Sequence, residues 1–299
     1  MNQSNQPLVS VVIACYNHEF FVQDSIQSVI DQTYQKIELI IIDDGSRDGS
    51  VEKIKEMIPA CQERFVRFEF RHRPNKGLSA TLNEALEWCE GEYFSALASD
   101  DMIKPHKISY QTKILNCKPH VSGVFGGTEV ILKNGQILKS KLKQREYGFV
   151  DIFLHEHNLP ALTQLIRLED LRNVNGFREK FIIEDWVMWL DLTQSGKSLY
   201  LDDEVVGSYR RHEGNLSGQL NKMLKGRLQI IESFQEHSLY KKAKAKVYFI
   251  QAIEQQSFDK VKSMPLMIKA ISLNPQLVFT KSFMGYLVKF VIKRQSIFS

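Results

Sequence analysis

The stretch "LVSVVIACY" (residues 8–16) is a run of apolar, largely β-branched residues, typical of a strand buried on both faces of a parallel sheet. The segment "IELIIIDDGS" (37–46) repeats the pattern, and "FVRFEFRH" (65–72) alternates as a further strand. The mostly apolar start of "EYFSALASDD" (92–101) predicts a fourth strand. Segments with helical spacing of apolar residues separate these four strands. The β-α-β-α-β-α-β order predicts an α/β fold with a Rossmann-like, mostly parallel central sheet flanked by helices.

Several helices and one more strand can be placed from sequence signals. Ser50 is a residue type that caps helices, and it predicts a helix that runs through Ile58. The segment 78–91 contains strong helix formers and ends at a glycine, a common C-terminal stop. A helix over 105–117 and a strand over 121–132 follow, and then the pattern becomes irregular.

Charge divides the chain of 299 residues into two parts. The net charge is +4, but residues 218–299 carry 14 Lys and Arg against 4 Asp and Glu, whereas residues 1–217 sum to −6. We therefore expect a domain over residues 1–217 that holds the catalytic site. A basic helical C-terminal region over 218–299 follows, with a helical hairpin at 243–275.

The last part of this basic region has two interpretations. The segment "SFMGYLVKFVIKRQ" (282–295) mixes apolar residues with Lys289, Lys293 and Arg294, so a helix there suits an anionic membrane surface. Its apolar positions equally suit packing against neighbouring helices. The sequence does not decide between them.

Composition argues against several classes of protein. The four cysteines are widely spaced and form no Cys-x-x-Cys pair, so neither a zinc cluster nor a disulfide framework is indicated. The sequence shows no secretion signal and no run of about 18 apolar residues, which favours a cytoplasmic, soluble or peripheral protein. The acidic body disfavours nucleic-acid binding, and a dehydrogenase would need the glycine-rich Gly-x-Gly-x-x-Gly motif.

Two of the predicted strands end in adjacent carboxylates, Asp43-Asp44 and Asp100-Asp101. We find no neighbouring Lys or Arg that explains them as simple ion pairs, and buried unpaired charge is costly. Ligands of such sheets bind at the carboxyl ends of the strands, and Mg²⁺ takes one or two carboxylates together with phosphate oxygens. These doublets favour a nucleoside diphosphate site, although capping of loops and helices is the alternative.

A set of motifs together resembles family 2 glycosyltransferases of the bacterial surface-polysaccharide type. The resemblance covers about residues 7–217 and implies the glycosyltransferase A fold. No single motif would suffice, but their order is specific. The motifs are "VSVVIACYN", "QTYQKIELIIIDDGSRDGS", "NKGLSATLNEAL", "GEYFSALASDD", "EDWVMWLDL" and "YRRHEGNLS".

The resemblance implies a nucleotide site at the ends of the first two strands. The segment from Ala14 to Asn17 would lie against the nucleoside, with the ring of Tyr16 stacked on the base. The alternative for Tyr16 is a core tyrosine at the end of a strand. Asp44 would accept a hydrogen bond from the uracil ring, and Asp43 would fix the loop.

The resemblance also implies groups that face the diphosphate. Lys76 would offset phosphate charge, or else face solvent. Arg210 or Arg211 would neutralise the leaving diphosphate. Ser99 would donate to ribose or phosphate.

The family's metal motif is Asp-x-Asp, and here it aligns Asp100 with the second Asp and Ala98 with the first. Asp100 is therefore the expected ligand to Mn²⁺ or Mg²⁺, with Asp101 beside it as a possible acceptor from a metal-bound water. In relatives a histidine at the position of His212 reaches the metal or diphosphate; a hydrogen-bonded structural histidine is the alternative. The loss of the first aspartate predicts a weaker but working metal site.

The segment "FIIEDWVMWLDL" predicts a helix that starts near Glu184 and Asp185. Two acids at a helix N-terminus can simply complement the helix dipole. The resemblance implies instead that Asp185 is the general base that deprotonates the acceptor hydroxyl, with Glu184 orienting the acceptor or the loop.

Taken together, the resemblance implies an inverting transfer of a sugar from a nucleotide-sugar donor, most simply a UDP-sugar, to a hydroxyl of a glycan or lipid-linked acceptor. Surface-polysaccharide synthesis at the inner face of the plasma membrane fits this reaction. The alternative is a non-catalytic nucleotide-sugar sensor or scaffold, which Ala98 supports and Asp185 argues against. A nucleotidyltransferase would need a glycine-rich basic loop after the first strand, and "ACYNHEFF" is not one.

Overall fold

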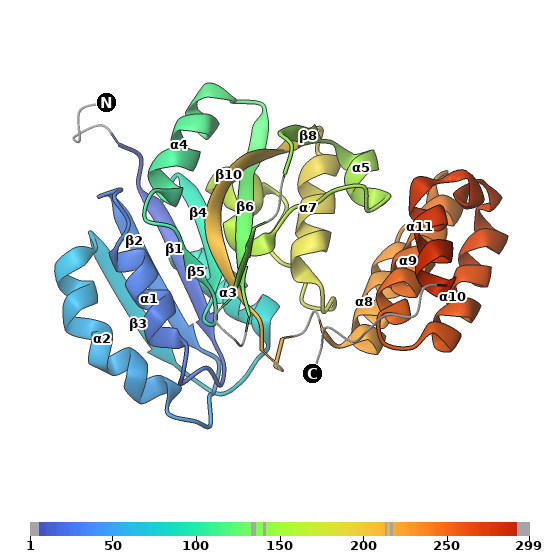
Figure 1. Ribbon diagram of the computed structural model, residues 1–299. Coiled ribbons are helices and arrows are strands. Elements are labelled where there is room, and N and C mark those ends of the chain that lie inside the picture. Colours follow the sequence, from blue (N-terminus) through green and yellow to red (C-terminus); the bar gives the residue numbers. More distant parts are fainter. Residues whose placement is uncertain (1–5, 133–135, 140–141, 213, 216–217, 292–299) are drawn as a thin grey trace. The chain divides into compact units, whose positions relative to one another are not determined.

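The computed structural model describes residues 6–132, 136–139, 142–212, 214–215 and 218–291 (Figure 1). Within this part the chain divides into two compact units. Unit 1 comprises the described residues up to 152, together with 157–180 and 184–212. Unit 2 comprises 153–156, 181–183 and the described residues that follow His212. The predicted boundary between 217 and 218 thus lies a few residues beyond the one in the structure.

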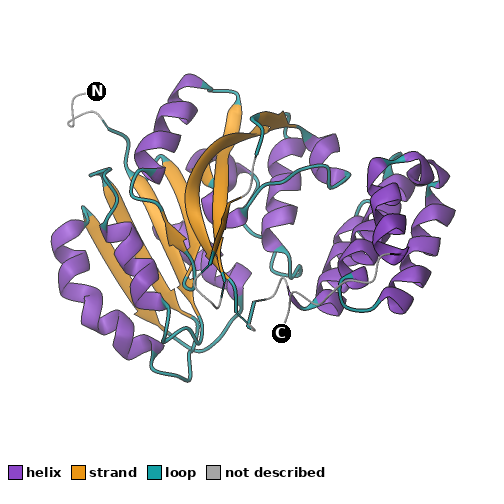
Figure 2. Ribbon diagram, viewed as in Figure 1, coloured by secondary structure: helices purple, strands orange, loops and turns teal. Residues whose placement is uncertain are grey.

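A ten-stranded mixed sheet forms the centre of unit 1, with helices against it (Figure 2). The main strand order is β3-β2-β1-β4-β9-β6-β10-β5, while β7 pairs with β6 and β8 with β10. The strands are β1 Val9–Cys15, β2 Ile37–Asp43, β3 Arg67–His72, β4 Tyr93–Ala98, β5 Met102–Ile103, β6 Val121–Ile131, β7 Ile137–Lys139, β8 Arg145–Tyr147, β9 Leu165–Arg167 and β10 Ser198–Arg210. The predicted α/β fold with a mostly parallel centre is confirmed.

Parallel pairing aligns the ends of the first four strands. Cys15 of β1 lies opposite Asp43 of β2, and Ala14 lies opposite Ala98 of β4. Asp43 in turn pairs with His72 of β3. The segments that follow these strands therefore leave the sheet at one edge, which is where ligands of such sheets bind.

The helices of unit 1 bury apolar faces against this sheet. In α1, for example, Val22, Ile26 and Val29 are completely buried in the same core as β1 and β2. The helices are α1 Val22–Ile30, α2 Ser50–Arg64, α3 Leu78–Trp88, α4 Lys107–Cys117, α5 Phe149–Phe153, α6 Leu168–Asn173 and α7 Glu184–Gln194, with a short 3₁₀ helix at Ala161–Thr163.

The predicted limits of α2 were wrong at both ends. Gly49, not Ser50, is the N-cap residue, and the carboxylate of Asp48 accepts from the N–H of Ser50 at 3.1 Å. The hydroxyl of Ser50 instead accepts from the N–H of His18 in the loop after β1, at 2.9 Å. The helix also continues past Ile58 and through Pro59 to Arg64. The Arg64 guanidinium donates to backbone carbonyls of the α1–β2 connection, which holds the last turn in place.

Unit 2 consists mainly of helices, as predicted for the basic C-terminal region. They are α8 Leu220–Glu232, α9 Tyr240–Gln256, α10 Lys260–Leu273, a 3₁₀ helix (η4) Pro275–Phe279 and α11 Lys281–Val291. The expected hairpin at 243–275 corresponds to α9 and α10, which share a core with Phe249 and Met267. None of the helices in the described ranges is long and apolar enough to cross a bilayer.

Lys107, the first residue of α4, is completely buried inside unit 1. Its Nζ donates to Ser95 Oγ at 2.8 Å and to the carbonyl of Gln164 at 3.0 Å. Burial lowers the pKa of Lys107 to about 7, because the charged ammonium loses its hydration. The folded protein therefore releases this proton well before the unfolded chain, in which a lysine has a pKa of about 10.4.

The lowered pKa of Lys107 predicts that the wild-type protein becomes more stable as pH rises. The variant Lys107→Met should lack this rise. Between pH 7 and 10 the unfolded chain binds more protons than the folded protein, so the free energy of unfolding increases with pH, here by about 3 kcal/mol. Urea unfolding of both proteins at several pH values measures the difference. Parallel curves for wild type and variant would show that Lys107 is charged inside the fold.

Candidate active site

The loops after β1 and β2 are tied together by Asn17. Asn17 adopts a left-handed backbone conformation, with φ at 55°, which turns the chain sharply after β1. Its N–H donates to Ser46 Oγ at 2.8 Å, and its side-chain oxygen accepts from the N–H of Arg47 at 2.8 Å. Asn17 thus sets the shape of this edge of the sheet.

Asp43 bonds within the loop after β2, and the role that the resemblance implies for Asp43 is to fix this loop. Its buried carboxylate accepts from the N–H of Ser46 and bonds Nδ1 of His72, each at 2.9 Å. The turn that follows requires Gly45, because φ there is 78° and a Cβ would lie 2.6 Å from the backbone nitrogen of Asn75. The loop after β2 and the segment after β3 therefore lie in close backbone contact at Gly45.

Asp44 is buried and organises the segment after β3. Its Oδ1 accepts from the N–H of Lys76 at 2.8 Å, and its Oδ2 from the N–H of Gly77 at 2.9 Å. The guanidinium of Arg73 forms an ion pair with the same carboxylate. A carboxylate offers about four lone-pair sites, so these three contacts leave capacity for a further donor.

Arg73 is a cationic partner of Asp44, although no Lys or Arg neighbours this carboxylate in the sequence. It is 29 positions from Asp44 in the sequence, and β2–β3 pairing brings the two together. Its other nitrogens donate to Glu84 at 2.8 Å and to Thr81 at 2.9 Å. Lys76, by contrast, has a 60% exposed side chain, with Nζ 3.6 Å from Glu84. Arg73, with a side chain only 10% exposed, is therefore a largely covered cation at this edge, and Lys76 is an exposed cation beside it.

A cavity of about 200 Å³ opens beside these groups. The side chain of Tyr16 is 44% exposed at its rim, so Tyr16 is not a core tyrosine and its ring is available for stacking. The cavity thus combines an aromatic ring, a carboxylate and an amide, the groups a nucleoside needs. It is lined by Ala14, Cys15, Tyr16, Asp44, Asn75, Gly77, Leu78 and Thr81.

Asp100 and His212 come together from positions 112 residues apart. Oδ2 of Asp100 lies 2.8 Å from Nε2 of His212 and 3.9 Å from Nε2 of His18. Candidate ligand atoms of the three side chains all lie within 4.8 Å of one another. His18 was not predicted from the sequence, because it lies outside the motifs and reaches Asp100 only through the pairing of β1 with β4.

Ser99 and Asp101 support this cluster from either side of Asp100. Ser99 Oγ bonds Nδ1 of His18 at 2.7 Å, and both Ser99 and Asp101 are buried. Asp101 accepts from the backbone N–H of Arg210 at 2.9 Å, which ties β4 to the end of β10. Burial and the neighbouring charge of Asp100 raise the pKa of Asp101 to about 8.

Arg210 lies next to the cluster, and its charge is already paired. One nitrogen lies 2.7 Å from the carboxylate of Asp24, and Nε donates to the carbonyl of Asp100 at 3.2 Å. The guanidinium also lies over the ring of Phe21, 5.1 Å from its centroid, and the same ring stacks on His212. Because Asp24 is exposed, this ion pair is weak and can exchange for a phosphate.

The donor set fits a divalent metal ion. One carboxylate and two imidazoles converge at Asp100, and imidazole suits Mn²⁺ and later transition metals, whereas Mg²⁺ prefers oxygen. Burial lowers the pKa of His18, which favours the neutral imidazole that a metal requires. When bound, such an ion would stabilise the negative charge of a departing diphosphate.

Glu184 and Asp185 form the first turn of α7, whose N-terminal end lies toward the edge where β1, β2 and β4 end (Figure 1). The carboxylate of Asp185 accepts from the N–H of Trp186 at 2.6 Å, and Trp186 anchors the helix through its ring N–H. Burial raises the pKa of both carboxyl groups, and the negative charge of Asp185 raises that of Glu184 further. A base with a raised pKa is suited to accept a proton near neutral pH.

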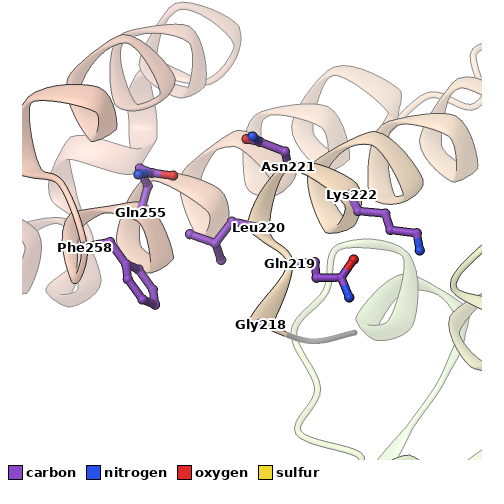
Figure 3. Close-up of a pocket in the computed structure, with 7 residues that line it drawn as sticks. All are labelled: Gly218, Gln219, Leu220, Asn221, Lys222, Gln255 and Phe258. Carbon is purple, nitrogen blue, oxygen red and sulfur yellow. The ribbon is translucent and has the colours of Figure 1, made fainter. Parts of the chain in front are cut away.

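Unit 2 contains a separate cavity of about 380 Å³ around the start of α8 (Figure 3). Figure 3 shows Leu220 between Phe258 and Gln219. None of the lining residues is acidic or a histidine, so this cavity offers no metal ligands or base of the kind found in unit 1. They are Gly218, Gln219, Leu220, Asn221, Lys222, Gln255 and Phe258.

Comparison with curated proteins adds independent support. Residues 10–174 match the family model described as Glycosyl transferase family 2. An uncharacterized glycosyltransferase of Rickettsia bellii is 35% identical over 213 residues, which is 69% of this chain and 30% of that protein. The chain thus spans about a third of the length of the first two curated relatives that it matches. The Escherichia coli protein WfgD, a "UDP-Glc:alpha-D-GlcNAc-diphosphoundecaprenol beta-1,3-glucosyltransferase", is 27% identical over 255 residues, 84% of this chain and 96% of WfgD.

Solved structures show the same fold. Staphylococcus aureus TarS 1-349 in complex with UDP-GlcNAc has a TM-score of 0.58 at 16% identity, covering 95% of this chain and 80% of TarS. The mannosyltransferase PcManGT from Pyrobaculum calidifontis, in complex with GDP-Man and Mn²⁺, has a TM-score of 0.60 at 12% identity, covering 97% of this chain and 86% of PcManGT. The motifs, the fold and the family match agree: the chain belongs to glycosyl transferase family 2.

Proposed function

We propose that this protein is an active glycosyltransferase that moves a sugar from a UDP-sugar to a hydroxyl of a glycan or lipid-linked acceptor, with inversion, in the synthesis of a surface polysaccharide. The observation that carries the proposal is the placement of the Asp100–His212 pair and the Tyr16–Asp44 cavity on one edge of the sheet. The printed specificity of WfgD and the UDP-GlcNAc complex of TarS support the donor and acceptor classes.

In this proposal the residues of the cavity bind and orient the nucleoside. Tyr16 stacks on the base, and Asp44 accepts from the base N–H with its remaining lone pair. Ala14 lines the cavity, and Asn17 holds the neighbouring loops through its bonds to Ser46 and Arg47. Arg210 and Lys76 supply positive charge near the diphosphate, and Asp100 with His212 would hold the metal ion.

Asp185 is the proposed base. Its carboxylate takes the proton of the acceptor hydroxyl while the acceptor oxygen forms a bond to the anomeric carbon. The bond from that carbon to the diphosphate oxygen breaks, and its electron pair leaves with the nucleoside diphosphate. Burial and the charge of Asp185 raise the pKa of Glu184, so its protonated form can donate a hydrogen bond to the acceptor.

The direct test is a panel of nucleotide sugars incubated with lipid-linked and glycan acceptors, with release of nucleoside diphosphate as the readout. We expect turnover with at least one UDP-sugar and loss of that turnover on chelation of divalent metal. Binding of donors without turnover, whatever the acceptor, would favour the sensor alternative, which the replacement of the family's first aspartate by Ala98 also supports.

The variant Asp185→Asn tests the base. We expect kcat to fall about 10²- to 10⁴-fold while the donor Kd stays unchanged, because the side chain acts on the acceptor proton. In the wild type, turnover should be lost as pH falls through the raised pKa of Asp185, above the ordinary range near 3.9. The exposed Asp203→Asn is the matched control; equal turnover of wild type and Asp185→Asn would remove Asp185 from the mechanism.

We further propose that unit 2 binds an anionic membrane surface through α11. Phe283, Tyr286 and Phe290 face the core of unit 2, so part of the helix packs internally. The opposite face exposes the apolar side chains of Met284 and Val288. No acidic residue interrupts α11, and the basic region carries a charge of +10, which attracts anionic lipid and opposes pairing of two copies through this face.

Sedimentation with lipid vesicles measures this interaction. We expect the full chain to bind vesicles containing phosphatidylglycerol and not those of phosphatidylcholine alone. The double variant Met284→Ser with Val288→Ser should weaken binding about 30-fold, since about 1 kcal/mol is lost for each of the two apolar side chains. A pair of exposed valines in unit 1, changed by Val66→Ser and Val150→Ser, is the control. Equal binding of the α11 variant and the wild type would contradict the proposed surface.

A further inference from the structure

The position that the family's first metal-motif aspartate would occupy is Ala98, and the structure shows what lies near it instead. Ala98 is the last residue of β4, and β1 pairs with β4 so that Ala14 lies directly opposite. The chain leaving β1 turns at Asn17 and places His18 beside Asp100. An imidazole from the loop after β1 thus approaches Asp100, and β1 is the strand next to the position of the missing carboxylate.

Three features make His18 suited to be a ligand. Ser99 Oγ bonds its Nδ1 at 2.7 Å, so the ring is held with Nε2 directed to Asp100, 3.9 Å from Oδ2. A hydrogen bond to the other ring nitrogen is the usual way in which proteins orient a metal-ligating histidine. The ring also lies edge-on to His212, with ring centroids 5.7 Å apart, so the two imidazoles approach Asp100 from different directions.

The separation of the donor atoms also suits a shared ion. Metal–nitrogen and metal–oxygen bonds are about 2.0–2.2 Å long for transition metals, so ligand atoms on one ion lie about 3–4 Å apart. Here Asp100 Oδ2 is 2.8 Å from His212 Nε2, and all candidate atoms lie within 4.8 Å. Small side-chain rotations would bring all three onto one ion.

We propose that His18 is the third protein ligand of the metal site, in place of the family's first aspartate, and that the site is a two-histidine, one-carboxylate site selective for Mn²⁺ and related transition metals over Mg²⁺. The proposal deepens the proposed function, since it concerns the same site. It follows from ligand chemistry: two imidazoles lower the affinity for Mg²⁺, which prefers oxygen, and leave open positions for diphosphate oxygens.

A purely structural role for His18 makes a different prediction. In that case the ring serves only to bond Ser99 and to fill space beside Phe21, 6.0 Å away between ring centroids. Its loss would lower stability and leave the number of nitrogen ligands on a bound metal unchanged. The two roles therefore separate in a measurement on the metal itself.

Pulsed electron paramagnetic resonance of Mn²⁺ bound to the full-length protein, without donor or acceptor, counts the coordinated imidazoles. We expect nitrogen couplings from two histidines in the wild type and from one in His18→Ala. We also expect the Mn²⁺ Kd to rise about tenfold or more in His18→Ala, and tenfold excess Mg²⁺ to leave Mn²⁺ bound to the wild type.

The controls separate this inference from sugar transfer and from folding. His106→Ala removes a partly exposed histidine on another loop and should change neither couplings nor Kd. If His18→Ala does not fold, the wild-type spectrum alone still tests the proposal. Nitrogen couplings from a single histidine in that spectrum would overturn it. Two couplings without any turnover would instead contradict the proposed function and leave His18 as a ligand.

Discussion

Parallel pairing of β1 with both β2 and β4 is the constraint on which the site depends. It places Cys15 opposite Asp43 and Ala14 opposite Ala98, so the segments that leave the three strands emerge at one edge. Completely buried aliphatic side chains hold these strands in register, and a slip of one residue would reverse every side chain. The cavity beside Tyr16 and the cluster at Asp100 are separate consequences of this one arrangement.

The sequence predicted the parts of the molecule that local patterns determine. Runs of β-branched residues located β1 and β2, and a mostly apolar run located β4, because strands buried on both faces are largely apolar. Paired carboxylates at strand ends indicated the functional edge before any fold was known. The resemblance to family 2 glycosyltransferases supplied what no local pattern holds, namely the meeting of Asp100 with His212 across 112 residues.

The features that the sequence did not predict depend on contacts between distant segments. Arg73 neutralises Asp44 only because β3 pairs with β2, and His18 meets Asp100 only because β4 lies beside β1. The helix predicted to run through Ile58 continues past Pro59 to Arg64, where hydrogen bonds of Arg64 to the α1–β2 connection hold its last turn. In each case contacts between distant segments outweigh the local preference of the chain. A single sequence does not display such contacts.

The central claim is that Asp100 and His212 would hold a metal ion whose charge stabilises the diphosphate of a donor bound beside Tyr16. Isothermal titration of UDP in the presence of Mn²⁺ and in the presence of a chelator tests it most directly. The account predicts that Mn²⁺ tightens UDP binding by about 5- to 150-fold, and that UDP tightens Mn²⁺ binding by the same factor. An equal UDP affinity in both conditions would contradict it, because the nucleotide and the metal would then occupy independent sites.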